Sequence, residues 1–233
     1  MNRPYILLFI SLCFLCHTKL LVAQDNGEDD VGAWWMVFGT HQFAEKWSLH
    51  TEIQYRTYEF GQNFNQLLLR TGVNYHFTDN ASVTFGYGYI ATDPTFIEPE
   101  QTEDTFEHRI FEQLAYKKQL GKFTLSHRYR LEQRFLNAPK RPSKTEHRAR
   151  YLLRVTYPIN QKWFITAYDE IFINLQKPLF GQNRLYGALG RNISPSISVQ
   201  IGYLKNHFDN AHYDRFQLGV WITTNLKKDL NEP

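Results

Sequence analysis

Apolar and polar residues alternate along most of the chain with a period of two, the period of a β-strand. In residues 46–59 the odd positions are mostly apolar or aromatic, and the even positions are mostly polar. Several such segments reach twelve to fourteen residues. Strands of soluble proteins have about five or six residues, whereas a tilted membrane strand needs about nine to eleven. The alternation predicts strands at 46–59, 64–77, 81–91, 105–119, 123–135, 145–157, 162–174, 182–192, 195–205 and 213–226.

The connections between these segments alternate between short turns and longer polar loops. Examples are the turn at 78–80 and the loop at 92–104, while 60–63 is a short exception among the longer loops. Transmembrane barrels have short periplasmic turns and longer external loops. The pattern therefore predicts an all-β, antiparallel up-and-down transmembrane barrel. Aromatic side chains beside the short turns are expected to form a girdle at the periplasmic interface; they are Trp47, Phe77, Phe123 and Trp163.

The number of strands is ambiguous at the N-terminal end. Residues 34–42 are apolar on both faces, and counting them as a strand gives eleven. Single-chain bacterial barrels have even numbers of strands. Either a further short strand lies near Asp30, or residues 34–42 are not part of the wall. We predict ten to twelve strands.

The N-terminal residues have the layout of a secretory signal. Arg3 is basic, residues 5–16 are almost all apolar, and Ala23 offers a small residue for cleavage. The apolar stretch is too short to span a bilayer as a helix. Together with the strands, this predicts export to the outer membrane of a Gram-negative bacterium. The predicted organisation is a signal peptide at 1–23, a short N-terminal segment at 24–32, the barrel at 33–227 and a tail at 228–233.

Composition narrows the chemistry of the exported chain. Aromatic residues make up 16% of the sequence, yet its mean hydropathy is −0.47, which suits apolar residues spread over an outer surface. Cys13 and Cys16 leave with the signal, so disulfides and thiolate sites are excluded. The formal charge falls from +3 to +1 when Arg3 and Lys19 are removed, which gives no indication of nucleic acid binding. Because no glycine-rich phosphate loop, zinc spacing or calcium loop is present, we expect no metal and no cofactor.

Four segments carry a resemblance to a known family: 126–135, 147–159, 168–175 and 182–194. With them, most of the exported chain resembles the bacterial domain-of-unknown-function family of short outer-membrane barrels common in Bacteroidota. The resemblance implies an outer-membrane barrel of unassigned activity and brings no catalytic residues to carry over. The expected partners are outer-membrane lipid and the barrel-assembly machinery. The last strand partly fits the assembly signal, although Thr224 stands where an apolar residue is expected.

If the apolar set faces lipid, the polar set lines the lumen, where eleven arginines face five glutamates, a surplus of six positive charges. Each such arginine favours a carboxylate or a bound anion. Arg128, Arg130 and Arg134 are expected to lie near carboxylates on the two adjoining strands, because antiparallel neighbours interact in pairs. The expected partners are Glu107 on one side and Glu146 on the other, with Glu132 in the same ladder. The set either braces a structural barrel or forms a narrow, anion-favouring pore or binding site for a small anionic solute. The candidate luminal residues are Arg128, Arg130, Glu132, Arg134, Arg148, Arg150, Arg154, Glu170 and Arg184.

An outer-membrane hydrolase acting on lipid or peptide is the alternative. Its nearest acid–base candidates are two His–Asp pairs near one outer loop, but loop His and Asp are usually solvent-exposed, so we assign no catalytic residue. Parity also places His108, Glu112 and His127 on the lipid face, which predicts a register shift, a bulge or a protein contact there. The two pairs are His207 with Asp209 and His212 with Asp214. Gly86 and Gly88 are expected to make room for bulky neighbours.

Overall fold

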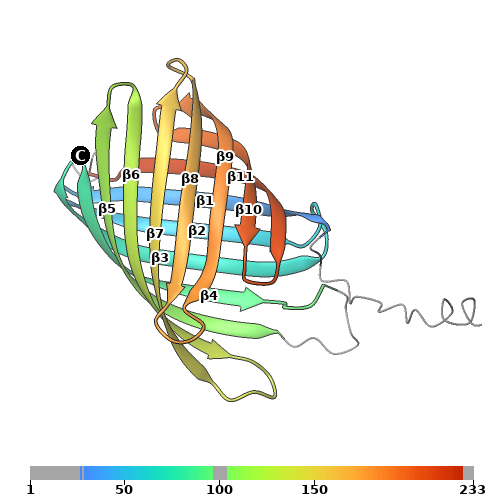
Figure 1. The fold of residues 1–233 in the computed structure, drawn as a ribbon. Coiled ribbons are helices and arrows are strands. Elements are labelled where there is room, and N and C mark those ends of the chain that lie inside the picture. Colours follow the sequence, from blue (N-terminus) through green and yellow to red (C-terminus); the bar gives the residue numbers. More distant parts are fainter. Residues whose placement is uncertain (1–26, 28, 97–103, 228–233) are drawn as a thin grey trace, which may run out of the picture.

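The computed structural model describes Gly27, residues 29–96 and residues 104–227. Its strands close into one barrel (Figure 1), which confirms the all-β fold with a strand count inside the predicted range. The predicted strand positions agree with the observed ones to within a few residues. In the described residues there are eleven strands: β1 (Val31–Ala44), β2 (Trp47–Thr57), β3 (Phe64–Thr78), β4 (Ala81–Thr92), β5 (Thr105–Leu120), β6 (Phe123–Asn137), β7 (Lys144–Pro158), β8 (Trp163–Asn174), β9 (Phe180–Ser194), β10 (Ile197–His207) and β11 (His212–Asn225).

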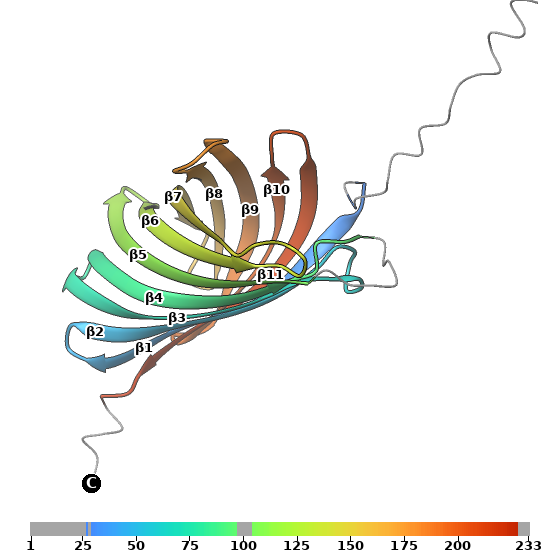
Figure 2. The ribbon, with the colours of Figure 1, turned by 90° about the horizontal axis from the view of Figure 1, so that it is seen from below.

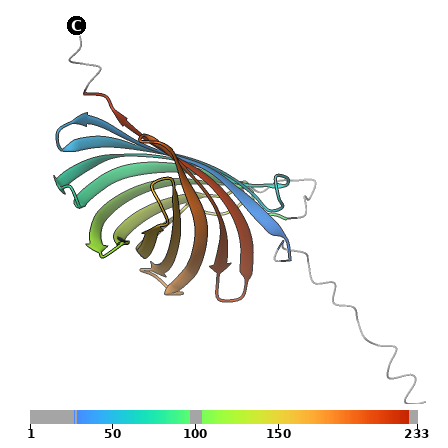
Figure 3. The same ribbon diagram turned by 90° about the horizontal axis from the view of Figure 1, so that it is seen from above.

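The strand pairing where the barrel closes contradicts both predictions for the N-terminal segment, a further strand near Asp30 and the exclusion of residues 34–42 from the wall. β1 is a full wall strand, and Asp30 lies before it in no further strand. β1 pairs with β2 in antiparallel fashion and with β11 in parallel, from Val31 beside Asp214 to Gln42 beside Asn225. Figure 3 shows the blue β1 lying along the red β11. Because the parallel pair satisfies both edges, an odd number of strands closes without a twelfth.

The two ends of the barrel differ in their connections. Between consecutive strands, the turns at one end are residues 45–46, 79–80, 121–122, 159–162 and 195–196; we call this the turn end. At the other end, the loop end, the connections are residues 58–63, 93–104, 138–143, 175–179 and 208–211, of which 97–103 lie outside the described residues. The connection 58–63 has as many residues as the loop 138–143, so the prediction of an exceptionally short connection there is wrong. Figure 2 shows the strands from below, where they curve around the barrel.

The two faces of the wall separate as the alternation predicts. Outward side chains such as Ile53, Leu131 and Ile201 are exposed, whereas inward side chains such as Glu132 and Gln217 are buried. The four predicted girdle residues, from Trp47 to Trp163, are exposed beside the turn end. Apolar side chains therefore cover the outside of the barrel, and polar side chains face inward.

Two glycine predictions have different outcomes. A Cβ added to Gly86 would lie 2.3 Å from Cζ of Phe111 and 2.6 Å from the carbonyl oxygen of Thr71. At Gly88 the nearest atom would lie 3.5 Å away, an ordinary contact. The prediction that glycine makes room for a bulky neighbour is therefore confirmed for Gly86 and wrong for Gly88.

In the part of the chain that the structure describes, no helix is long and apolar enough to cross a membrane. The predicted signal peptide at 1–23 and the predicted tail at 228–233 lie outside the described residues.

Candidate ligand-binding lumen

All nine candidate luminal residues point into the barrel. Eight of them line an internal cavity of about 740 Å³. The ninth, Glu132, lies behind the cavity surface with a relative exposure of 1%. The cavity volume falls within the range of about 300–1,000 Å³ that is usual for small-molecule sites. The strands that place these residues are β6, β7, β8 and β9.

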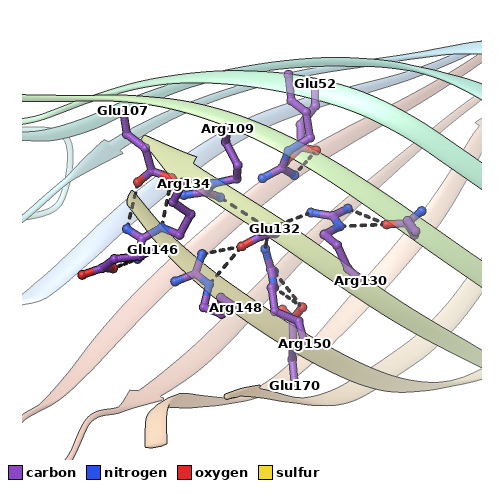
Figure 4. A network of polar contacts seen from close by, with 12 residues as sticks. Glu52, Glu107, Arg109, Arg130, Glu132, Arg134, Glu146, Arg148, Arg150 and Glu170 are labelled. Carbon is purple, nitrogen blue, oxygen red and sulfur yellow. Dashed lines mark hydrogen bonds and ion pairs between the residues drawn. The ribbon is translucent and has the colours of Figure 1, made fainter. Parts of the chain in front are cut away.

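Glu132 is the centre of the luminal charge network (Figure 4). Arg148 donates to its Oε2 from Nε at 2.9 Å and from Nη2 at 2.6 Å, and Arg150 donates to its Oε1 from Nη1 at 2.7 Å. Nη1 of Arg109 lies 3.5 Å from the same carboxylate, and Nη1 of Arg130 lies 3.7 Å from it. One carboxylate with a fully buried side chain thus joins β5, β6 and β7 across the inside of the wall. We call Glu132, Glu170, Glu107, Glu146 and the arginines paired with them the paired network.

Glu170 extends this network to β8. Its Oε1 accepts from Nη2 of Arg150 and from Nη2 of Arg128, each at 2.7 Å. Arg184 lies directly opposite Glu170 in the register of β8 and β9. Within the described residues it nevertheless forms no ion pair within 4.0 Å. The long side chains of Arg128 on β6 and Arg150 on β7 therefore pair with Glu170, although Arg184 is its direct neighbour in the register.

The expected pairing with Glu107 and Glu146 is confirmed for Arg134, at the loop end. It is wrong for Arg128, which pairs with Glu170 on β8, and for Arg130, whose carboxylate neighbour is Glu132 on its own strand. Nη2 of Arg134 lies 2.8 Å from Oε2 of Glu107, and its Nη1 lies 2.8 Å from Oε2 of Glu146. Glu107 also accepts from Nε of Arg109 at 2.6 Å, and Glu146 pairs with Lys144 at 2.6 Å. Figure 4 shows the carboxylates of Glu107 and Glu146 turned toward Arg134.

Inward phenylalanines support the network, and alternation alone did not single them out. Phe111 is fully buried, with the guanidinium of Arg130 at 4.7 Å and that of Arg70 at 5.4 Å from its ring centroid. The guanidinium of Arg150 lies 4.1 Å from the ring centroid of Phe172. Cation–π contacts of this kind stabilise a desolvated guanidinium. The signal that could have found these rings is their parity, since Phe111 shares its face with Arg109.

The opposite side of the lumen is apolar and aromatic. Trp34, Met36, Tyr186, Ala188 and Leu204 form a buried cluster, against which Phe38 and Tyr168 pack; we call these seven residues the aromatic wall. They lie on β1, β8, β9 and β10. The wall explains why residues 34–42 are apolar on both faces: one face contributes to this cluster, and the other is outside.

Arginines also reach the aromatic wall, but no carboxylate accompanies them. The guanidinium of Arg56 lies 3.7 Å from the Trp34 ring, and that of Arg184 lies 4.9 Å from it. Arg56 donates to the side-chain oxygens of Gln54 and Gln66. Arg154 lies 5.4 Å from the Tyr168 ring. Among the described residues, none of these three arginines has an ion pair within 4.0 Å.

Buried polar atoms without a hydrogen-bond partner among the described residues occur on both sides of the lumen, since Nε of Arg128 and Nη1 of Arg130 are among them, and four belong to the aromatic side. The Tyr186 hydroxyl, Nε1 of Trp34, Nε of Arg154 and Nε2 of Gln217 are buried and have no hydrogen-bond partner in the described part of the chain. Buried polar groups without a partner are costly and mark places that water or a ligand fills.

One of the acidic candidates for hydrolysis, Asp214, is engaged by neighbouring side chains. The carboxylate of Asp214 accepts from the Tyr203 hydroxyl and from Nζ of Lys205 at 3.0 Å. These contacts occupy the carboxylate that a catalytic histidine would need as its partner. In the described ranges, no group of three or more His, Cys, Asp or Glu side chains is placed to hold a metal ion.

The polar residues on the outer face lie in regular strands. The pairing of β5 with β4 and with β6 runs without a register shift. The prediction that a bulge or a register shift explains the polar residues His108, Glu112 and His127 on this face is therefore wrong. Each has a polar partner on a neighbouring strand: His108 with the Tyr87 hydroxyl at 2.5 Å, Glu112 with Gln133 at 3.2 Å, and His127 with the Tyr151 hydroxyl at 3.0 Å. The third expectation, a protein contact, stays a prediction.

A family model described as a protein of unknown function, DUF2490, matches residues 31–217. The chain belongs to the DUF2490 family. The matched segment contains the whole paired network and the whole aromatic wall, so both belong to the part of the chain that defines membership. The predicted resemblance to a family of unknown function is thus confirmed, while the Bacteroidota origin stays a prediction.

Two further comparisons complete the picture. None of the curated proteins compared with the DUF2490 chain matches it significantly. Among solved structures, the translocator domain of the autotransporter NalP from Neisseria meningitidis is similar, with 11% identity and a TM-score of 0.45, over 77% of this chain and 75% of that one. At this level of similarity nothing about function or location follows from the match.

Proposed function

We propose that this protein is an outer-membrane barrel of a Gram-negative bacterium whose lumen favours small anions. The location is supported by the exposed apolar outer face, by the aromatic residues at the turn end and by the contrast between short turns and longer loops. These are the features of transmembrane barrels, and a bacterium of the Bacteroidota type fits the resemblance. The chain would enter the membrane through the barrel-assembly machinery and contact lipid along its outer face.

The topology gives a direct test of the location. Single cysteines at Asn80, in a short turn, and at Lys140, in a loop, are introduced into the exported chain, whose sequence otherwise has no cysteine after Ala23. An impermeant thiol reagent added to intact cells is expected to label the Lys140→Cys variant and not the Asn80→Cys variant. The opposite labelling would invert the orientation, and equal labelling of both would remove the support for membrane insertion.

The anion preference follows from the charge that lines the cavity. Ten arginines and Lys117 line it together with four glutamates, and Glu132 lies behind them, so eleven cations exceed five carboxylates by six. A cavity with low-dielectric walls and a surplus of one sign raises the local concentration of the opposite ion. The observation that carries the proposal is that Arg56, Arg154 and Arg184 have no carboxylate partner in the described chain. A small barrel of this size allows at most a narrow passage.

Planar-bilayer recording tests the preference. With a salt gradient across the membrane, the purified protein is expected to show small conductance steps with a reversal potential on the anion side. Arg154→Glu changes the luminal charge by two units and should shift the reversal potential toward cations. The matched control is Arg191→Glu, an outward residue that lies over the Trp163 ring at the turn end. A cation-selective native barrel, or an equal shift in both variants, would contradict the proposal.

A further inference from the structure

The arginines without carboxylates lie next to two stacked tyrosines. Arg154, Tyr168 and Tyr186 are direct cross-strand neighbours on β7, β8 and β9. The two tyrosine rings stack with their centroids 4.7 Å apart. Arg184 precedes Tyr186 by two residues on the same inward face of β9. Two guanidinium groups therefore flank one aromatic surface inside the cavity, and all four residues line it.

These two arginines are less firmly held than those of the paired network. Arg150 donates three hydrogen bonds to Glu132 and Glu170. Among the described residues, Arg154 contacts the face of Tyr168, and Arg184 contacts the faces of Trp34 and Phe172 and the side-chain oxygen of Gln182. Both remain partly exposed within the barrel. A guanidinium in such surroundings keeps donors available for a bound carboxylate.

A second observation points to a ligand at the same place. Tyr186 is 3% exposed, and its hydroxyl has no hydrogen-bond partner among the described residues. Nε of Arg154 is likewise buried without a partner. The nearby carboxylate of Glu170 is paired with Arg128 and Arg150, and no carboxylate of the described residues forms an ion pair with Arg154 or Arg184.

We infer that Arg154, Arg184, Tyr168 and Tyr186 form a binding site for a small organic acid whose carboxylate is carried on a ring. The carboxylate would pair with the two arginines, and the ring would lie against the tyrosines and the neighbouring aromatic wall. A bare inorganic anion would use the arginines but leave the aromatic surface unused. The inference rests on the proposed function, since it names the class of anion that the lumen takes.

Calorimetric titration of the full exported chain in detergent tests this site with four probes. Glucuronate represents the sugar acids and benzoate the aromatic acids, while acetate lacks the ring and glucose lacks the charge. At least one ring acid is expected to bind roughly tenfold or more tightly than acetate, and glucose should give no measurable heat. Tighter binding of glucuronate would identify a sugar acid, and tighter binding of benzoate an aromatic acid. Acetate binding as tightly as both ring acids would overturn the inference.

Variants locate the binding. Arg154→Gln and Arg184→Gln should each weaken binding of the ring acid roughly tenfold or more, because each removes a charge-assisted contact. Arg191→Gln, which removes the same charge outside the lumen, should leave it unchanged. Tyr186→Phe should weaken binding several-fold while the melting temperature stays the same, since its hydroxyl has no hydrogen-bond partner among the described residues. Heat-modifiable gel mobility confirms that each variant folds. An equal loss in Arg191→Gln would overturn the site.

Failure of this inference is distinguishable from failure of the proposed function. Anion-selective currents with no discrimination between ring acids and acetate would refute the ring-acid site and leave the anion preference intact. Tight, arginine-dependent binding of a ring acid without any current would refute conduction and leave the site intact.

Discussion

The two sides of the lumen stabilise arginine in different ways. On β5 to β8, carboxylates do so: Glu132 and Glu170 between them hold Arg128, Arg148 and Arg150 at 2.6–2.7 Å. On the side of β1 and β9, aromatic faces do so, with Arg56 and Arg184 over Trp34. A carboxylate cancels the charge, whereas a ring only stabilises it. The paired network is thus suited to bracing the wall, and the aromatic side keeps cations available to an anion.

The largest expected effect comes from the centre of the paired network. Glu132→Gln leaves Arg148 and Arg150 without their shared charge and brings buried like charges together. Breaking a buried pair by removing one partner costs about 3–5 kcal/mol. The free energy of unfolding should fall by that amount, measured by urea titration of the fast-migrating folded band on unheated gels.

The control for Glu132 is Glu146→Gln. Glu146 lies near the loop end, its side chain is 18% exposed, and Arg134 keeps Glu107 when it is lost. We expect a loss of no more than about 1 kcal/mol, as for an exposed pair. Equal losses in the two variants would contradict the distinction between the buried centre and the rim of the network.

A smaller effect is expected where the backbone makes room for the network. Gly86→Ala would drive Cβ to within 2.3 Å of Phe111, the ring under Arg70 and Arg130. Overpacking of this kind costs about 1–3 kcal/mol. Gly88→Ala, with its nearest atom at 3.5 Å, is the matched control and should change stability little. Thermal unfolding of both variants compares them, and a larger loss at Gly88 would show that the crowding at Phe111 is relieved.

The smallest effect is expected on the aromatic side. Tyr186→Phe removes a buried hydroxyl without a hydrogen-bond partner in the described chain. No bond is lost, so stability should change by less than about 0.5 kcal/mol. Tyr203→Phe, which removes a hydroxyl that donates to Asp214, should cost about 0.5–1.5 kcal/mol. A loss in Tyr186→Phe as large as in Tyr203→Phe would mean that the empty lumen already satisfies Tyr186.

Period-two alternation was enough to place the strands and to assign the faces of the wall. It also anticipated the pairing of Arg134 with Glu107 and Glu146, because direct and diagonal neighbours on adjoining strands follow from register alone. The inward position of Phe111 was available from the same parity. An aromatic residue suits either face, however, and only its neighbours across the lumen show that it supports arginines.

Closure of the barrel decided what alternation left open. Whether residues 34–42 form a wall strand depends on β11, far away in the sequence, offering a parallel edge. Which arginines obtain carboxylates depends on reach: Arg128 and Arg150 extend to Glu170, and its register neighbour Arg184 turns toward Trp34 on β1. Side chains this long select partners across the curved interior, so the division between a neutralised side and a cationic side arises only when the barrel brings β1 and β9 around the same cavity.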